Sequence, residues 1–297
     1  MSKIHQEFPG GMLAAVSAFM IWGAAPVYIK LLKQVPVYEI VMHRVVWSFL
    51  FLLLLLIFQH RLNELTEAVK NRKIMLVLSL STILLGFSWF IVNRAIIHNQ
   101  VLQVSMGYYV SPLFSVIMGV VFFKERLSFL QIISLILVII SVIYLGICHN
   151  NFLWLVLSVA FSFVLYTLIR KAAPVMPLVG LCIETFLLAV PALSWLIYLD
   201  ITGTGSFLHT GIRMDLLLVG TPLITALPLL LLTIGAKKIP FSLLGILQYI
   251  MPCGGFILAV FVFDEPLVQT QLRAFILIWI AVFVWVADVI ADYRTAA

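Results

Sequence analysis

Three ionisable side chains stand at the head of a long apolar run in this sequence. Within "YEIVMHRVVW" (38–47), Glu39, His43 and Arg44 precede residues 45–58, which carry no charge. A carboxylate, an imidazole and a guanidinium at such a place could bind a polar solute or carry a proton along a path. Two structural alternatives are that they mark the water boundary or form a buried pair.

The length of the uncharged run indicates where these groups lie. Residues 45–58 rise about 21 Å as a helix, whereas the hydrocarbon core of a bilayer is about 30 Å thick. The helix must therefore begin near Val37, which draws all three groups below the membrane surface. A spacing of four puts Glu39 and His43 on one stripe, with Arg44 about 100° around the helix.

The composition is typical of a membrane protein. The chain is 64% hydrophobic and 10% charged, whereas soluble domains are about half apolar and about a quarter charged. Its net charge of +6 is explained by membrane topology, so no nucleic-acid partner is expected. The three cysteines, Cys148, Cys182 and Cys253, are far apart in or beside apolar runs, and they predict neither a metal site nor a disulfide framework.

An all-α integral membrane fold with ten spans follows from the apolar segments, since about 20 apolar residues cross a bilayer. The predicted spans are 10–32, 37–58, 74–94, 101–123, 128–148, 152–169, 175–199, 216–236, 239–263 and 268–288. The first is expected to be an uncleaved helix. The polar segments 59–73 and 200–215 are predicted loops.

The distribution of Lys and Arg predicts the orientation. With the N-terminus in the cytoplasm, twelve of these residues, including Arg170, fall on cytoplasmic segments and five on the opposite side. Short cytoplasmic loops are enriched in Lys and Arg. Both termini are therefore predicted to be cytoplasmic, although Lys30 and Lys33 fall on the less favoured side.

The chain also contains an internal repeat. A shift of 140 residues lays 109–136 on 249–276 with nine identities. The pairs that composition does not explain are Tyr109/Tyr249, Pro112/Pro252, Glu125/Glu265 and Gln131/Gln271. Each half then carries five helices, and because five is odd, the halves 1–149 and 150–297 are predicted to form an inverted repeat.

The matched prolines predict helix breaks at corresponding places. Proline frees a backbone carbonyl one turn earlier in a helix, and membrane helices tolerate this beside protein or a watery cavity. Pro112 and Pro252 lie near the middle of the fourth and ninth predicted spans. Paired breaks of this kind favour a central binding site and alternating access, while ordinary kinks packed by a neighbouring helix are the alternative.

The same shift places Arg44 on Glu184, near the centre of the seventh predicted span. Opposite charges at matched positions are predicted to approach each other or a shared cavity, and a fixed salt bridge is the alternative. Other polar residues expected along a solute path are Trp89, Asn93, Gln103, Tyr108, Tyr109, Gln248 and Tyr249. Glu39, His43 and Glu184 could exchange protons, which makes the proton a candidate coupling ion.

Two short elements carry a resemblance to a known group of proteins. The strings "FFKERL" (122–127) and "FVFDEPL" (261–267), closing the fourth and ninth spans, resemble the drug/metabolite transporter superfamily with its EamA-type repeats. That family usually has Gly-Glu here; Lys124 and Asp264 replace the Gly, so only Glu125 and Glu265 carry over.

Longer strings at 19–48, 105–113 and 243–252 resemble one group of bacterial inner-membrane permeases of this superfamily, and the likeness covers essentially the whole chain. The resemblance implies a secondary permease that moves small organic solutes, often outward. A facilitative channel or an exchanger without ion coupling is the alternative. The chain has no H-E-x-x-H, G-x-S-x-G or P-loop string, so neither enzymatic activity nor a cofactor is expected.

Overall fold

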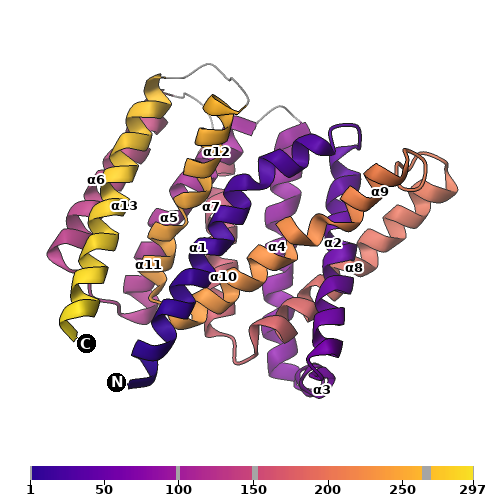
Figure 1. Cartoon of the computed structure of the whole chain (residues 1–297), viewed down its shortest axis with the longest axis horizontal. Coiled ribbons are helices and arrows are strands. Elements are labelled where there is room, and N and C mark those ends of the chain that lie inside the picture. Colours follow the sequence, from indigo (N-terminus) through magenta and orange to yellow (C-terminus); the bar gives the residue numbers. More distant parts are fainter. Residues whose placement is uncertain (1, 98–100, 149–152, 263–268, 297) are drawn as a thin grey trace.

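The structure is a computed structural model that describes residues 2–97, 101–148, 153–262 and 269–296. These residues form a bundle of helices with both ends of the chain at the same end of the bundle (Figure 1). No strand occurs within these ranges. The helices are α1 (Ser2–Leu31), α2 (Val37–Phe58), α3 (Leu62–Lys70), α4 (Arg72–Ile97), α5 (Val101–Phe123), α6 (Phe129–Cys148), α7 (Leu153–Ala172), α8 (Pro177–Ile201), α9 (Ile212–Val219), η1 (Thr221–Ile224), α10 (Ala226–Lys238), α11 (Phe241–Leu247), α12 (Ile250–Phe261) and α13 (Gln269–Ala296).

Most of these helices are long and apolar enough to cross a bilayer. Within the described ranges, eight segments meet that requirement, and two shorter apolar helices, Gly107–Phe123 and Phe129–Tyr144, match the fourth and fifth predicted spans. The span predicted at 37–58 coincides with α2. Large apolar side chains also cover the outside of the bundle, as Phe58, Phe129 and Phe283 show with about three quarters of their surface exposed. The chain is therefore a multi-pass membrane protein.

Two predicted segments have a different structure from the one expected. The polar segment 59–73 contains the short helix α3, where Arg61 donates through Nε and Nη2 to both carboxylate oxygens of Glu64 (2.7 and 2.6 Å). The predicted span 216–236 is divided into α9, η1 and α10. Gly220 and Pro222 lie at this division, and both residue types interrupt helices.

The two matched prolines behave differently. The break predicted at Pro112 is wrong, because α5 is continuous from Val101 to Phe123. Near Pro252 the chain is interrupted one turn earlier, between α11 and α12. Since Pro252 has no N–H to offer, the Gln248 carbonyl accepts instead from the Met251 N–H (3.2 Å), three residues away. This bond spans three residues, whereas a bond of an α-helix spans four, so the regular α-helix is interrupted at Gln248.

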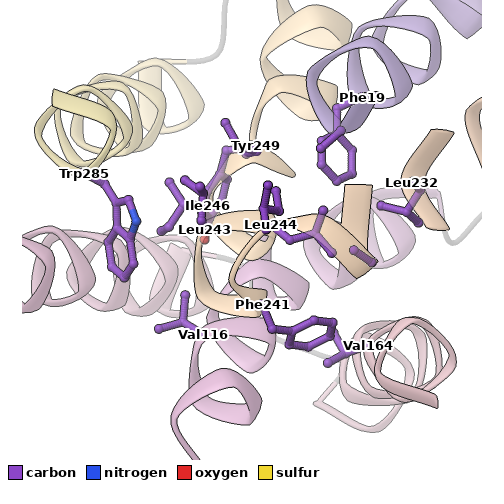
Figure 2. Close-up of a cluster of buried hydrophobic side chains, with 14 of the residues drawn as sticks. Phe19, Val116, Val164, Leu232, Phe241, Leu243, Leu244, Ile246, Tyr249 and Trp285 are labelled. Atoms are coloured by element: carbon purple, nitrogen blue, oxygen red, sulfur yellow. The ribbon is translucent and has the colours of Figure 1, made fainter. Parts of the chain in front are cut away.

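Helix α11 lies inside the bundle, within a large hydrophobic cluster. Every one of its seven residues is buried. Figure 2 shows its side chains surrounded by groups from the other helices: Phe19 of α1, Val116 of α5, Val164 of α7, Leu232 of α10 and Trp285 of α13. The interruption at Gln248 is therefore held in the interior of the molecule.

Glycines allow close helix contacts in this part of the bundle. A side chain at Gly254 of α12 would lie 3.0 Å from the Gly23 Cα of α1, and one at Gly245 of α11 would lie 2.9 Å from the Pro112 carbonyl oxygen of α5. Small residues at such crossings let helix backbones approach in membranes. The approach of α11 packs its backbone against that of α5 beside Pro112.

Candidate functional site

A cavity of about 330 Å³ lies between α1, α2, α4, α5, α7, α10 and α12. Its aromatic lining residues are Phe19, Trp22, Trp89, Tyr108 and Phe163, and its polar ones also include Arg44, Ser88, Thr225 and Gln248. The lining continues to Ile29 and Val37, beside the α1–α2 connection at the end of the bundle away from the termini. The volume is within the range of small-molecule sites.

Arg44 brings a positive charge to this cavity. It is half-buried, and its Nε donates to the Thr225 hydroxyl (2.8 Å). No described carboxylate forms an ion pair with it. Thr225 lies where η1 ends and α10 begins, so the division of the eighth predicted span positions this hydroxyl against α2.

Gln248 brings a second polar group, from the interruption between α11 and α12. The residue is 4% exposed, and its Nε2 has no hydrogen-bond partner in the described part of the chain. A buried amide without partners costs about 1–3 kcal/mol. Such a group on a cavity wall is suited to bind a solute or water.

The predicted pairing of Arg44 with Glu184 is wrong. Glu184 is fully buried on α8, where its carboxylate accepts from the Ser81 hydroxyl and from the Tyr166 hydroxyl (3.2 Å). The Nε of Arg170 lies 3.5 Å from the same carboxylate. Glu184 is absent from the cavity lining. Its side chain extends from α8 toward α4 and α7, and not toward α2.

Arg170 was expected on a cytoplasmic segment, but it lies inside α7 with none of its surface exposed. Its Nη2 donates to the Pro177 carbonyl (3.0 Å). Gly180 of α8 leaves room for the guanidinium, because an added Cβ would overlap it. Gly180 precedes Glu184 by four residues, so it lies on the same helix face. In the sequence, the glycine four residues before Glu184 was the feature that could have indicated this site for a guanidinium.

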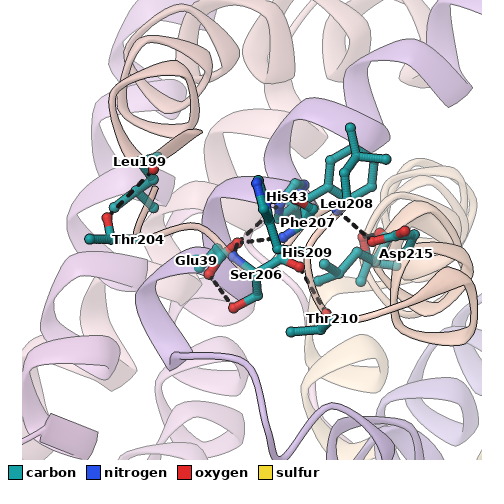
Figure 3. Close-up of polar contacts among 12 residues, drawn as sticks. Glu39, His43, Leu199, Thr204, Ser206, Phe207, Leu208, His209, Thr210 and Asp215 are labelled. Carbon is teal, nitrogen blue, oxygen red and sulfur yellow. Dashed lines mark hydrogen bonds and ion pairs between the residues drawn. The ribbon is translucent and has the colours of Figure 1, made fainter. Parts of the chain in front are cut away.

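Glu39 and His43 are buried beside the segment 202–211 and do not line the cavity. Figure 3 shows the Glu39 carboxylate accepting from the Ser206 N–H (2.7 Å), the Ser206 hydroxyl (2.8 Å) and the Phe207 N–H (3.2 Å). The His43 ring packs on Phe207, with centroids 4.9 Å apart. These two residues thus attach the segment 202–211 to the start of α2.

The other predicted path residues are divided between several places. Trp89, Tyr108 and Gln248 line the cavity. Tyr109 and Tyr249 do not line it; the Tyr249 hydroxyl donates to the Tyr109 carbonyl (2.9 Å) in the core. The side chains of Asn93 and Gln103, and all of Glu265, lie outside the described residues. Sequence reasoning missed Trp22, Phe163 and Thr225, although the Gly-Thr-Pro string at 220–222 could have indicated the division beside Thr225.

The end of the bundle that holds the termini is closed by contacts between helix ends. Glu125 accepts from the Phe241 and Ser242 N–H groups at the start of α11 (2.6 and 2.9 Å). Lys171 of α7 donates to the Ala236 and Ile239 carbonyls at the end of α10 (2.6 Å each). We call these the closing contacts. They join the segment after α5 to α11, and α7 to α10, at the end of the bundle that holds the termini (Figure 1).

Two larger hollows with apolar linings differ from this cavity in chemistry. One, of about 660 Å³, lies between α1, α12 and α13, and the other, of about 560 Å³, between α2, α4 and α8. Exposed apolar side chains such as Ile257 and Phe283 line the first, as expected of grooves that face lipid. Across the described residues, no group of three or more His, Cys, Asp or Glu side chains could hold a metal ion.

Comparisons with known proteins agree with this architecture. Residues 9–147 match the EamA-like transporter family. The chain is 35% identical to the uncharacterized transporter YojE of Bacillus subtilis, with 95% of each chain covered. It is 34% identical to Protein RarD of Escherichia coli, with 96% of each covered. A crystal structure at 16% identity has the same fold, with a TM-score of 0.71 over 93% of this chain and 97% of that one.

These relatives share the whole bundle and not merely one helix pair, since both align over nearly their full length. The chain therefore belongs to the EamA-like transporter family of the drug/metabolite transporter superfamily.

Proposed function

We propose that this protein is a secondary transporter that moves small organic solutes across a bacterial inner membrane by alternating access. The observation that carries the proposal is the internal cavity, which both halves of the chain line. The closing contacts hold helix ends together at the end of the bundle that carries the termini. A carrier needs a solute site in the interior that opens to one side at a time.

The arrangement of the helices supports an inverted repeat of residues 1–149 and 150–297. Under the 140-residue shift α1 corresponds to α7, α4 to α10, and α5 to α11 and α12. The packing of α1 on α10 and α12 then has its counterpart in the packing of α7 on α4 and α5. In the hydrophobic cluster around α11, the matched Tyr109 and Tyr249 are hydrogen-bonded to each other. Two halves of equivalent structure can exchange conformations, which is the basis of alternating access.

The proposed orientation has both termini in the cytoplasm. Arg170 no longer contributes to the charge count, because it is buried in α7. The other eleven cytoplasmic Lys and Arg residues still exceed the five on the opposite side. In this orientation the closing contacts lie on the cytoplasmic side. The conformation described is then one in which the cavity is accessible from the outer side.

A second candidate is an exchanger or facilitator without ion coupling. The described lining of the cavity includes neither a carboxylate nor a histidine. Glu39, His43 and Glu184, the candidate proton carriers, have structural partners elsewhere. This favours solute exchange over proton-driven accumulation.

Counterflow in proteoliposomes tests the proposal. Vesicles preloaded with an unlabelled solute should take up the same labelled solute transiently and saturably. A pH gradient should increase accumulation only if protons are coupled. Suitable solutes are small aromatic carboxylates, amino acids and chloramphenicol. Saturable counterflow of any one supports a carrier, whereas linear flux without counterflow supports a channel, and no flux of any of them contradicts transport.

A further inference from the structure

We infer that the cavity recognises organic anions with an aromatic body, and that Arg44 holds the anionic group. The inference rests on the proposed function, because it names the class of solute that the same site takes. Three independent features of the cavity lead to it: its unbalanced charge, its hydrogen-bond donors and its aromatic walls.

The charge of the cavity is unbalanced. Among the described arginines of the apolar spans, two are withdrawn from the bundle surface, the half-buried Arg44 on α2 and the fully buried Arg170 on α7. Arg170 has Glu184 beside it (3.5 Å), whereas the hydrogen-bond partner of Arg44 among the described residues is the neutral hydroxyl of Thr225 (2.8 Å). Charged groups inside a membrane are normally paired or face a watery path. Arg44 is the arginine that lines the cavity, so an anionic solute would supply its missing partner.

The polar residues that line the cavity with Arg44 can all donate hydrogen bonds. A guanidinium has five N–H groups in a planar fork that fits a carboxylate or phosphate oxygen pair, and the contact with Thr225 occupies one of them. Gln248 adds an amide nitrogen that has no partner among the described residues. Tyr108 and Ser88 add hydroxyls to the same lining. A group with several acceptor oxygens would satisfy these donors together.

The rest of the lining is suited to a flat apolar body. Five aromatic residues contribute to it, and Trp22 lies in the middle of a ring cluster, 6.1 Å from Phe19 and 6.1 Å edge-on from Phe163. Aromatic rings pack favourably at such offset and edge-on geometries. The volume of about 330 Å³ is at the lower end of the range of small-molecule sites, which suits a small organic molecule.

The same features disfavour other solutes. An organic amine would bring a second positive charge next to Arg44, and like charges at close range are repelled strongly where water is scarce. A neutral amide would leave the positive charge of the Arg44 guanidinium without a negative partner. We therefore expect the order carboxylate, then amide, then amine for molecules of one shape.

Binding to the purified full-length protein in lipid nanodiscs tests this order. The labelled probes are benzoate, phenylacetate and 3-phenylpropionate, and the competitors are the amide and amine of each. At least one carboxylate should bind saturably, and its amide and amine should compete at least tenfold more weakly. Arg44→Gln should weaken binding of that carboxylate at least tenfold, and Arg44→Lys should restore part of it. Arg61→Gln, a matched change at an arginine outside the spans, should leave binding unchanged.

Several outcomes would overturn the inference. They are saturable binding by none of the three carboxylates, equal or better competition by the amides or amines, and unchanged carboxylate binding in folded Arg44→Gln. The order among wild-type competitors needs no variant, so it decides the matter even if Arg44→Gln does not fold. Failure of the proposed function is distinguishable, since selective anion binding without counterflow would reject the carrier and leave anion recognition intact.

Discussion

At the scale of single residues, the partner of each buried charge decides what that charge does. Arg170 and Glu184 are each fully buried and lie beside each other, with Ser81, Tyr166 and the Pro177 carbonyl completing the cluster. Such a cluster fixes α4, α7 and α8 relative to one another. Arg44 instead has a neutral partner and a cavity in front of it, an arrangement suited to a ligand.

Replacing Glu184 tests this distinction. Glu184→Ala leaves Arg170 as a buried charge without its carboxylate, and removing one partner of a buried pair costs about 3–5 kcal/mol. We expect a loss of that size in the free energy of unfolding in detergent. Arg44→Gln, which removes no partner of a buried carboxylate, should lower stability by less. Equal losses in the two variants would contradict the assignment of Glu184 to Arg170.

Gly180 is predicted to be necessary for the same cluster. In Gly180→Ala the new methyl group overlaps the Arg170 guanidinium, and overpacking of this kind costs about 1–3 kcal/mol. The thermal unfolding midpoint should fall. Gly255→Ala on α12 is the matched control, since nothing lies within 4 Å of its added Cβ. A midpoint unchanged in both variants would show that Arg170 lies elsewhere.

At the scale of elements, the connections between helices are held by carboxylates that accept backbone N–H groups. Glu39 binds the segment 202–211 at the end of the bundle away from the termini (Figure 1), and Glu125 binds the start of α11 at the end that holds the termini. The two contacts lie at opposite ends of the bundle. Loss of one of these contacts should loosen only the end of the bundle at which that contact lies.

Glu39→Ala should release the segment 202–211. The N–H groups of Ser206 and Phe207 lose their acceptor, and each buried donor left unpaired costs about 1–3 kcal/mol. Hydrogen exchange of these two amides should speed up, while exchange at Phe241 stays as in the wild type. Glu64→Ala, on the exposed helix α3, should affect neither. Unchanged exchange at Ser206 in Glu39→Ala would contradict the contact.

Glu125→Ala should open the end of the bundle that carries the closing contacts. The Phe241 and Ser242 N–H groups would have no carboxylate, so conformations with that end open become more populated. Exchange at both amides should rise, and counterflow should change in rate. Glu67→Ala on α3 is the control. Wild-type exchange at Phe241 would mean that Glu125 does not hold α11.

At the scale of the whole molecule, the sequence predicted what apolar length and composition determine. The α2 boundaries followed from the length of one uncharged run, and the interruption before Pro252 followed from a missing N–H. The unbroken helix at Pro112 did not follow. The partner of Glu184 did not follow either, because it depends on which helix packs alongside. Periodicity and spacing carry no information about such neighbours.

The central claim for the whole molecule is that the cavity opens to the two sides of the membrane in turn. The most direct measurement is the labelling of Met251→Cys, at the cavity wall, in a background with Cys148, Cys182 and Cys253 replaced by alanine. A membrane-impermeant thiol reagent is applied to right-side-out and to inside-out vesicles. We predict labelling from the outer side when Glu125 is retained, and labelling from the cytoplasmic side that increases when Glu125→Ala is added. Labelling from neither side, or from the cytoplasmic side alone in both backgrounds, would contradict the account.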